Sequence, residues 1–436
     1  MKLVMVGMGY VGLVSAVCYA GMGHDVICYD VDLKKIQLLR EGKCPIHEQG
    51  LSELLHKYAD AGRLVFATSL DTVVDCPMAI IAVGTPPLEN GAPDLTYVHR
   101  AIDALTSRLP MGAVVVMKST VPVGTSKRIQ RQMQRLGRDD LTIASFPEFL
   151  REGSAVEDTL HPSRLVFGVA DAHSEALLRS LYPETSAPVI VCDSTTAEMV
   201  KYSSNAFLAT KISFINEIAN ICMKVGADVQ TVAEGMGKDP RIGPDFLKAG
   251  IGYGGSCFPK DTRALVRLAD DIDYDFRVLK SVVEINQRQR LAPVRALKSW
   301  FPDLSGIVVG ILGVAFKPGT DDVRESPAVD LATDLLSREV ELRLCDPVVE
   351  GVIQVGRHAC SILRDPYEAL SGCDAAILIT DWPQFKRLDW AKIRTVMRGH
   401  QVFDGRNFFE PAEVRAHGFL LENMGRMESH STVPLS

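Results

Sequence analysis

The chain has 436 residues, of which 47% are hydrophobic and 23% charged, a mixture that excludes a disordered chain and a coiled-coil rod. At about 150 residues per domain, this length predicts roughly three domains. Lys and Arg number 47 against 54 Asp and Glu, and the resulting formal charge of −7 gives no general reason to bind nucleic acid or an anionic membrane. An anionic ligand would have to be held by local groups.

The first part of the chain alternates apolar strands with helical patterns. Strands are predicted over 3–6, 25–29, 78–83, 113–118 and 142–145, and helices over 11–21, 34–41, 50–60 and 97–108. This alternation predicts an α/β, doubly wound sheet of Rossmann type over residues 1–195. Residues 3–23 carry no charge and resemble a signal peptide or membrane helix, but their glycines and strand-like start favour a buried strand followed by a buried helix.

Residues 196–300 predict a central helical domain. A helix capped by Thr195 or Thr196 runs with few breakers to Gly226. Because this is longer than most globular helices, we expect it to bridge two domains. A second helical stretch is predicted over 278–298.

Residues 301–436 predict a smaller, Rossmann-like α/β domain. Buried strands are expected from 307, over 340–345 and over 375–380, with a helix over 327–338. The polar tail from about 425 is expected to be frayed.

The ten cysteines are scattered, and no two stand in a Cys-x-x-Cys spacing. This argues against zinc and against a redox pair, so no metal is expected. Dispersed free thiols in a large chain are typical of the reducing cytoplasm, which is the predicted location.

A glycine motif follows the first strand and opens a helix. Gly7 permits a tight turn, Gly9 lets the backbone approach a pyrophosphate, and Gly12 lets helix and strand pack closely. Asp30 ends the second strand, where a ribose-binding carboxylate belongs and where it would repel the 2′-phosphate of NADP. NAD is therefore the predicted cofactor. The alternative is a glycine-rich turn without a ligand.

Three polar groups suit a site at one edge of this sheet. Thr85 and Thr120 each follow an apolar strand, at the edge where parallel sheets bind ligands, although either could lie in a simple turn. Glu148 and Glu152 are four residues apart, so on a helical turn they would share a face and suit acid–base chemistry. A capped helix start with solvated carboxylates is the alternative.

Two further groups suit covalent chemistry. Lys201 and Asn205 are also four residues apart and could stabilise an oxyanion together, although a solvated helix face is the simpler interpretation. The loop from Gly250 has four glycines within six residues and leads to Cys257, with Lys260 and Asp261 close behind. A thiol in an electropositive loop readily becomes a nucleophile, whereas the other nine cysteines are expected to be inert.

In the order in which they follow one another along the chain, these motifs resemble those of the UDP-glucose/GDP-mannose dehydrogenase family. The resemblance runs from Lys2 to about Asn407. The resemblance extends to residues 316–327 and to 404–406. It implies an NAD-dependent, four-electron oxidation of a sugar C6 alcohol to a carboxylate. The segments 238–250 and 257–259 resemble the branch that uses UDP-glucose, and GDP-mannose or a UDP-N-acetyl-hexosamine are the alternatives.

The resemblance also implies roles for single residues. Cys257 would be the nucleophile, and Lys201 with Asn205 would hold the oxyanion. Asp261 would transfer protons, and Glu148 would act in thioester hydrolysis. The implied catalytic positions are Cys257, Lys201, Asn205, Asp261, Glu148 and Thr120.

The same resemblance implies two sets of binding residues. The NAD positions are Gly7, Gly9, Tyr10, Val11, Gly12, Asp30, Lys35, Thr85, Thr120, Glu152, Lys260 and Arg324. The sugar-nucleotide positions are Glu148, Phe149, Leu150, Arg151, Glu152, Lys201, Asn205, Arg241, Phe246, Lys248, Ile251, Gly252, Tyr253, Gly254, Gly255, Lys317 and Arg406.

Members of this family are dimers built on the long central helix, so a homodimer is expected, with Arg241 reaching the partner's substrate. A non-catalytic nucleotide-binding relative is an alternative, but it would have lost the reactive residues, and Cys257, Lys201 and Asp261 are all present. A hydroxyacid-type dehydrogenase with a histidine base is also disfavoured, because no histidine stands in one of these motifs.

Overall fold

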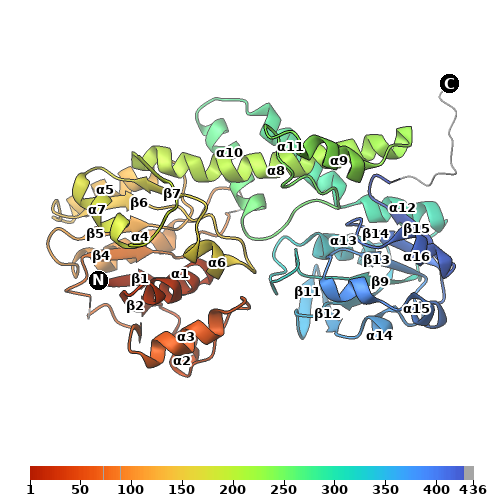
Figure 1. Ribbon diagram of the computed structural model, residues 1–436, viewed down its shortest axis with the longest axis horizontal. Coiled ribbons are helices and arrows are strands. Elements are labelled where there is room, and N and C mark those ends of the chain that lie inside the picture. Colours follow the sequence, from red (N-terminus) through yellow and green to blue (C-terminus); the bar gives the residue numbers. More distant parts are fainter. Residues whose placement is uncertain (72, 89, 427–436) are drawn as a thin grey trace. The chain divides into compact units, whose positions relative to one another are not determined.

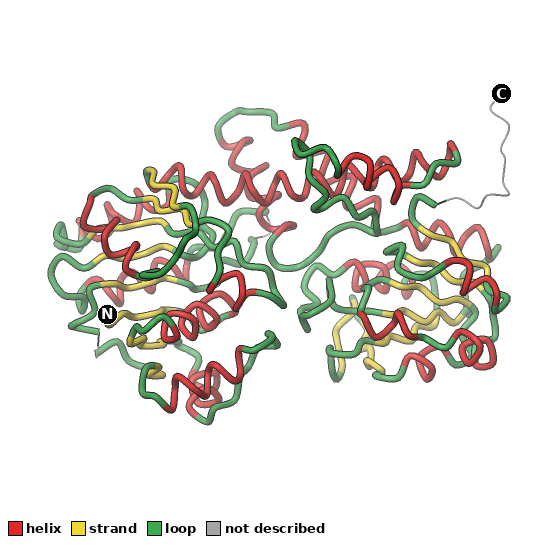
Figure 2. The backbone as a smooth tube through the Cα atoms, viewed as in Figure 1, coloured by secondary structure: helices red, strands yellow, loops and turns green. Residues whose placement is uncertain are grey.

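The computed structural model describes residues 1–71, 73–88 and 90–426, which fall into two compact units. The first unit comprises Met1–Ser204 and Arg263–Asp273, and the second Asn205–Thr262 and the chain from Tyr274 onward. Figure 1 labels helices and strands where there is room, and Figure 2 colours the backbone by secondary structure. Most of the tail predicted to be frayed, residues 427–436, lies outside the described residues.

The first unit is built on an eight-stranded sheet in the order β3-β2-β1-β4-β5-β6-β7-β8. The strands are β1 (Lys2–Val6), β2 (Asp25–Tyr29), β3 (Leu64–Ala67), β4 (Met78–Ile81), β5 (Val114–Met117), β6 (Thr142–Ser145), β7 (Leu165–Gly168) and β8 (Val189–Cys192). Every neighbouring pair is parallel except β6 and β7. The strand order reverses between β1 and β4, and sheets of this kind bind nucleotides at that point.

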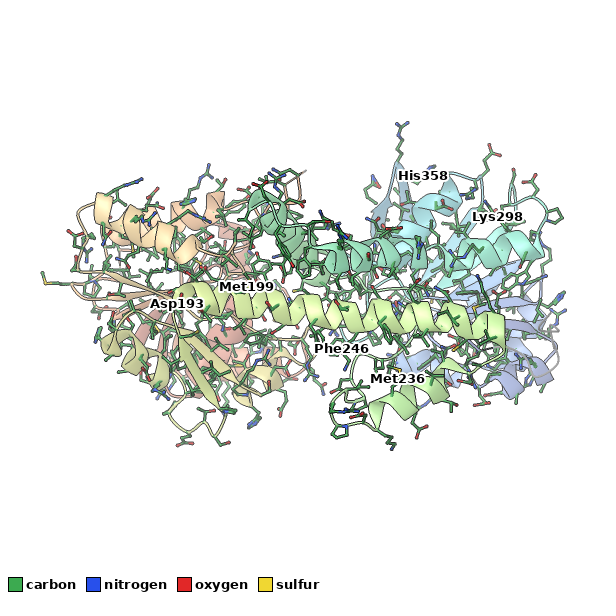
Figure 3. All side chains as sticks on the ribbon, turned by 90° about the horizontal axis from the view of Figure 1, so that it is seen from above. Asp193, Met199, Met236, Phe246, Lys298 and His358 are labelled. Atoms are coloured by element: carbon green, nitrogen blue, oxygen red, sulfur yellow. The ribbon has the colours of Figure 1, made fainter. Side chains whose placement is uncertain are left out.

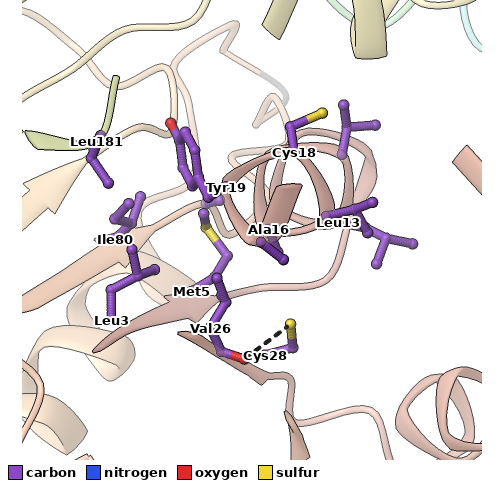
Figure 4. Packing of buried hydrophobic residues seen from close by; sticks show 14 of the residues in the cluster. Leu3, Met5, Leu13, Ala16, Cys18, Tyr19, Val26, Cys28, Ile80 and Leu181 are labelled. Carbon is purple, nitrogen blue, oxygen red and sulfur yellow. Dashed lines mark hydrogen bonds between the residues drawn. The ribbon is translucent and has the colours of Figure 1, made fainter. Parts of the chain in front are cut away.

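Helices cover both faces of this sheet. One face is covered by α1 (Tyr10–Gly21), α2 (Leu33–Arg40), α3 (Leu51–Asp60), α6 (Ala155–Leu160) and α7 (Ala172–Ser180), and the other by α4 (Thr96–Thr106) and α5 (Thr125–Arg135). Figure 4 shows Tyr19 and Ala16 of α1 in one buried cluster with Leu3 and Met5 of β1. Strands buried on both faces are apolar throughout, which explains the unbroken apolar runs in the sequence.

The long central helix is α8 (Ser194–Val225), which is continuous over 32 residues and belongs to both units. Its predicted cap was wrong: Asp193, labelled at the start of this helix in Figure 3, accepts hydrogen bonds from the amides of Thr195 and Thr196 at 2.9 and 3.3 Å. A carboxylate satisfies these amides and also meets the positive end of the helix. Neither α8 nor any other described helix is long and apolar enough to cross a membrane.

Shorter helices complete the central part. They are α9 (Val229–Gly237), α10 (Phe258–Asp271), α11 (Arg277–Gln289) and α12 (Ala292–Trp300). The helical stretch predicted over 278–298 is therefore divided between α11 and α12, with a break at residues 290–291. Pro293 occupies the first turn of α12, where its missing amide is tolerated, whereas in a continuous helix it would remove a hydrogen bond and clash with the preceding turn.

A seven-stranded sheet in the order β11-β12-β10-β9-β13-β14-β15 forms the rest of the second unit. The strands are β9 (Val308–Leu312), β10 (Glu341–Cys345), β11 (Val352–Val355), β12 (His358–Leu363), β13 (Ala375–Leu378), β14 (Gln401–Asp404) and β15 (Leu420–Asn423). Only β11 and β12 pair antiparallel among the described strands of this sheet. One face is covered by α12 and α13 (Pro327–Leu336), and the other by α14 (Pro366–Leu370), α15 (Trp390–Val396) and α16 (Pro411–Ala416).

This second sheet repeats the turn chemistry of the first. Gly313 follows β9 with φ +92°, as Gly7 follows β1 with φ +97°. Asp346 follows β10 and accepts hydrogen bonds from the amides of Val314 and Ala315 at 2.7 and 3.0 Å. The predicted fold class, two Rossmann-type sheets with a long helix between them in the chain, is confirmed.

Candidate active site

The glycine loop after β1 fits the diphosphate of a dinucleotide. A Cβ on Gly7 would lie 2.8 Å from the carbonyl oxygen of Ala82, and one on Gly12 only 1.8 Å from that of Gly7, so the fold itself requires glycine at both positions. A Cβ on Gly9 would meet no atom of the described chain within 4 Å, so this position leaves open space instead. Among the described residues no side chain caps α1, and its first turn carries no acid, so its amides are suited to an anion.

Asp30 lies directly after β2, beside this loop. Its carboxylate accepts hydrogen bonds from the amides of Met8 at 2.7 Å and Asp32 at 2.9 Å, and from the ammonium of Lys35 at 3.0 Å. Burial alone would raise the pKa of Asp30, but these donors outweigh it and hold the pKa below its ordinary value. The structure thus brings Asp30 and Lys35 together with the glycine loop, and the carboxylate is charged at neutral pH.

Thr85 and Thr120 lie on two loops that are tied to each other. The hydroxyl of Thr85 donates to the carbonyl oxygen of Thr120 at 2.9 Å, and that of Ser119 donates to the carbonyl oxygen of Val83 at 2.7 Å. These loops follow β4 and β5, and β4 is the neighbour of β1 at the point of strand reversal. The two strand-end motifs therefore form one rim beside the glycine loop.

Glu148 and Lys201 form a buried ion pair within the first unit. The ammonium of Lys201 donates to Oε1 of Glu148 at 2.8 Å and to its carbonyl oxygen at 2.7 Å, and the amide of Leu150 donates to Oε2 at 2.6 Å. The two residues are 7% and 4% exposed. Burial alone would raise the pKa of Glu148. The charge of Lys201 and its hydrogen bond lower this pKa by more than burial raises it, so the carboxylate is ionised.

The expectation that Glu148 and Glu152 share one face of a helical turn is wrong. Residues 146–151 are irregular, and α6 begins only at Ala155. Gly153 has φ +84°, a left-handed conformation that a right-handed helix running through from Glu148 does not contain. Glu148 is buried against Lys201, whereas Glu152 lies half-buried in a turn.

This irregular segment is held in place by Glu48, which sequence reasoning missed. The amides of Gly153 and Ala155 donate to the Glu48 carboxylate at 2.7 and 2.8 Å, and the hydroxyl of Tyr10 donates to it as well. The predicted NAD residue Tyr10 is thereby joined to the segment that carries Glu148. Glu48 stands in a loop without a recognisable motif, so its role depends on contacts that only the fold provides.

A second buried lysine, Lys118, faces the ion pair. It follows β5, is 3% exposed, and its ammonium lies 4.2 Å from the centre of the Phe146 ring. Burial lowers the pKa of Lys118 to about 8. The negative charge of Glu148 acts to raise this pKa, whereas the positive charge of Lys201 lowers it further. Sequence reasoning gave this lysine no role of its own, although it directly follows a strand whose side chains are all apolar.

In the second unit, Asn205 and Asp261 are bonded to each other. Nδ2 of Asn205 donates to Oδ2 of Asp261 at 2.6 Å, and the ammonium of Lys260 donates to Oδ1 at 2.7 Å. Asn205 is 6% exposed and Asp261 1%. Asn205 stands one turn after Lys201 on α8, so a single helix carries members of both polar groups.

Cys257 immediately precedes α10, so Lys260 and Asp261, expected close behind the glycine loop, lie in a helix that begins at Phe258. The amide of Asp261 donates to the carbonyl oxygen of Cys257 at 2.9 Å and closes the first turn. The thiol is partly exposed, with the Ser256 hydroxyl 3.6 Å from Sγ. A helix amino end stabilises a thiolate, so this position suits a nucleophile.

The nine other cysteines are all free thiols. Burial raises the pKa of the thiols at Cys18, Cys28, Cys44, Cys76, Cys192, Cys222, Cys345, Cys360 and Cys373. A raised pKa disfavours the thiolate, which is the reactive form. Among the described residues, no three His, Cys, Asp or Glu side chains are grouped so as to hold a metal ion.

The glycine-rich segment before Cys257 is fixed by side chains of α11 and its end. Oδ1 of Asn286 accepts from the amide of Tyr253 at 2.8 Å, and its Nδ2 donates to the Tyr253 carbonyl at 3.1 Å. Arg290 donates to the same carbonyl at 2.6 Å. A Cβ on Gly252 would lie 2.6 Å from Oδ1 of Asn286, and one on Gly254 would lie 2.2 Å from a neighbouring carbonyl oxygen. The segment is therefore rigid, and its glycines are required by close packing.

The remaining predicted sugar-nucleotide residues lie in varied surroundings. Arg406 donates to the carbonyl oxygens of Gly252 at 3.2 Å and Ile379 at 2.7 Å. Phe246, labelled in Figure 3, has φ +64° and its ring centre lies 6.1 Å from that of Phe258. Among the other members, Ile251 is buried and Lys248 is exposed. A Cβ on Gly255 would crowd the ring of Phe316, and the ammonium of Lys317 lies 5.8 Å from the centre of that ring. Three arginines form ion pairs with nearby aspartates: Arg241 with Asp239, Arg324 with Asp322, and Arg151 with Asp158.

The models of one protein family match three successive parts of the chain. Residues 1–186 match the NAD binding domain of the UDP-glucose/GDP-mannose dehydrogenase family, 195–288 its central domain, and 310–411 its UDP binding domain. The chain is 43% identical over 438 residues to the UDP-glucose 6-dehydrogenase TuaD of Bacillus subtilis, covering 99% of this chain and 95% of that protein.

Two solved structures are similar along nearly their full length. A UDP-glucose dehydrogenase from the hyperthermophilic archaeon Pyrobaculum islandicum gives a TM-score of 0.89 at 38% identity, covering 98% of each chain. A UDP-D-ManNAc dehydrogenase from Pyrococcus horikoshii gives 0.87 at 29% identity, covering 98% of this chain and 99% of that one. The chain therefore belongs to the UDP-glucose/GDP-mannose dehydrogenase family, and its first domain is an NAD binding domain.

Proposed function

We propose that this protein oxidises the C6 alcohol of UDP-glucose to a carboxylate with NAD. The observation that carries the proposal is Cys257 at the amino end of α10, one turn before the Asp261 carboxylate that Asn205 binds. We prefer UDP-glucose as the substrate because this chain is 43% identical to a relative named as a UDP-glucose 6-dehydrogenase. It is only 29% identical to the UDP-D-ManNAc dehydrogenase. GDP-mannose and UDP-N-acetyl-hexosamines are the alternative substrates.

NAD, when bound, accepts a hydride in each of two oxidations. The thiolate of Cys257 adds to the C6 aldehyde left by the first oxidation and forms a thiohemiacetal, which the second oxidation converts to a thioester. Water then hydrolyses the thioester, releasing the carboxylate and the thiol. In sum, the alcohol, one water and two NAD⁺ give the carboxylate, two NADH and three protons. A covalent hemiacetal holds C6 in one orientation, whereas a free aldehyde hydrate would not.

The polar residues supply charge and protons to these steps. Lys201 and Asn205 are one helical turn apart, so their ammonium and amide can bind one oxyanion on C6. Asp261, which binds Asn205 and Lys260, is the proposed group that exchanges a proton with the substrate or a water. Glu148, kept ionised by Lys201, is the proposed base for the water that attacks the thioester.

We also propose a homodimer built on α8. Phe207, Phe214, Ile221 and Val225 lie seven, seven and four residues apart on this helix and are 65%, 49%, 54% and 57% exposed. This spacing places them on one face, and an exposed apolar stripe of this kind is typical of a protein interface. Light scattering after size exclusion should give twice the chain mass, and Phe214→Glu should give the monomer. A monomeric wild type would contradict the proposal.

A substrate panel tests the proposed activity. NADH formation is followed with UDP-glucose, GDP-mannose, UDP-N-acetylglucosamine and UDP-N-acetylmannosamine, each with NAD and with NADP. We expect kcat/KM to be highest for UDP-glucose with NAD. A higher value for another sugar nucleotide would transfer the proposal to that substrate, and no NADH with any of them would refute the oxidation.

A further inference from the structure

Glu198 is a buried carboxylate on α8 whose partners lie at the start of another helix. It is 4% exposed. Its Oε2 accepts a hydrogen bond from the amide of Gly124 at 2.5 Å, and its Oε1 accepts from the amide and hydroxyl of Ser126 at 2.8 and 2.7 Å. Gly124 stands directly before α5, and Ser126 is in its first turn. Glu198 therefore caps α5 from outside its own chain segment.

This contact is strong on physical grounds. The first amides of a helix have no partner within the helix, and they carry its positive end. Gly124 at the cap position has no side chain to accept from them. A carboxylate with three short hydrogen bonds at this place makes charge-assisted contacts in a dry environment. Burial raises the pKa of Glu198, and the Ser126 and Gly124 donors only partly offset this.

The contact also lies next to two parts of the proposed site. Glu198 precedes Lys201 by three residues, so both lie on neighbouring positions of one helix face. The loop that ends at Gly124 begins with Thr120, whose carbonyl binds Thr85. Helical residues rise about 1.5 Å each, so fixing Glu198 fixes the height of Lys201, about 4.5 Å further along the axis.

We propose that Glu198 is a positioning residue for Lys201. By binding the amino end of α5, it holds α8 at the height at which the Lys201 ammonium meets both the carboxylate and the carbonyl oxygen of Glu148. The inference rests on the proposed function, in which Lys201 stabilises an oxyanion. Without the Glu198 contact, α8 can shift or rotate against α5, and the ammonium loses its place while the helix itself remains folded.

A double-mutant cycle tests this inference in the full-length protein. Glu198→Ala should lower kcat about 10- to 100-fold, the range expected when a catalytic group is displaced by about 1 Å. The double variant with Lys201→Ala should be no slower than Lys201→Ala alone, because Glu198 acts through Lys201. Losses that multiply would overturn the proposal.

Two variants separate positioning from loss of stability. Asp171, an exposed residue, caps α7 in the same unit by accepting from the amide of Ser174 at 2.7 Å, so Asp171→Ala removes a helix cap away from Lys201 and should leave kcat unchanged. Glu198→Gln keeps one acceptor oxygen for Ser126, and its kcat should lie between those of wild type and Glu198→Ala. Equal losses in Glu198→Ala and Asp171→Ala at equal loss of Tm would refute a specific role.

A readout without turnover keeps this inference separable from the proposed function. Lys201 is 4% exposed and should resist a small amine-reactive reagent, with the extent of labelling measured by mass spectrometry. Glu198→Ala should increase labelling of Lys201, and Asp171→Ala should not. Unchanged labelling refutes the positioning role even if the enzyme is active. Increased labelling in a protein that oxidises no sugar nucleotide would refute the function and leave the positioning role standing.

Discussion

Replacing Lys118 with methionine tests which force dominates at the buried charges of the first unit. Lys118 has an ordinary pKa of 10.5 that burial lowers to about 8, despite the nearby charge of Glu148. The unfolded chain therefore binds more protons than the folded chain between about pH 8 and 10.5, and stability should rise with pH across this window. Below pH 8, the buried ammonium destabilises the folded state in full.

The magnitude follows from the same two values. Each unit by which the pKa of the folded state lies below the ordinary pKa is worth about 1.4 kcal/mol. The ammonium therefore destabilises the folded protein by about 3 kcal/mol at pH 7. Its contact with the Phe146 ring, at 4.2 Å, returns about 1 to 2 kcal/mol when desolvated. Lys118→Met keeps most of the side-chain volume, and it should therefore raise the free energy of unfolding at pH 7 by about 1 kcal/mol or more.

The assay is urea unfolding of wild type and Lys118→Met at pH 7, 8, 9 and 10. All three tryptophans lie beyond Tyr274, so their fluorescence reports the second unit, and a change seen only by circular dichroism belongs to the first. The stability gain should shrink as the pH rises above 8. Lys127→Met, at an exposed position of α5, is the matched control without such a trend. A loss of stability in Lys118→Met at pH 7, or a difference independent of pH, would refute the reasoning.

Three other predictions concern the cofactor loop and the nucleophile. Gly9→Ala should keep the wild-type Tm but weaken NAD binding in calorimetry. Gly12→Ala should lower the Tm, because its Cβ would lie 1.8 Å from the carbonyl oxygen of Gly7. The reverse pattern would contradict the roles given to these two glycines. Asp30→Ala should raise the KM for NAD about 10-fold or more, the worth of a hydrogen bond to a charged group, and an unchanged KM would remove its ribose role. Cys257→Ser should still bind NAD and UDP-glucose in calorimetry but release no sugar acid, and full turnover would sink the nucleophile assignment.

The strongest local patterns predicted the fold correctly. The strands β2 (Asp25–Tyr29) and β6 (Thr142–Ser145) have the predicted bounds, because parallel strands buried on both faces leave unbroken apolar runs. The helix α5 was missed, since only a few of its residues, such as Ile129 and Met133, are buried and the rest are polar. The sharp start of α10 at Phe258 was missed because the glycines before it suggest a longer loop.

The motifs of the candidate site could be predicted from the sequence, but the contacts between residues far apart in the chain could not. Glycine spacing and strand ends identify the cofactor loop from the sequence alone. The partners Lys201 and Glu148 are 53 positions apart, and Asn205 and Asp261 are 56 apart, so their contacts depend on how α8 packs. Glu198 carries no local signal at all, because a glutamate on a long helix is ordinarily solvated.

The measurement that tests the central claim most directly is the number of NADH molecules formed per UDP-glucose. A limiting, known amount of UDP-glucose is incubated with excess NAD until the absorbance of NADH stops rising. A thioester on Cys257 that passes on to the carboxylate requires two NADH per sugar. One NADH per sugar would mean that the reaction stops at the aldehyde, and it would contradict the covalent role proposed for Cys257.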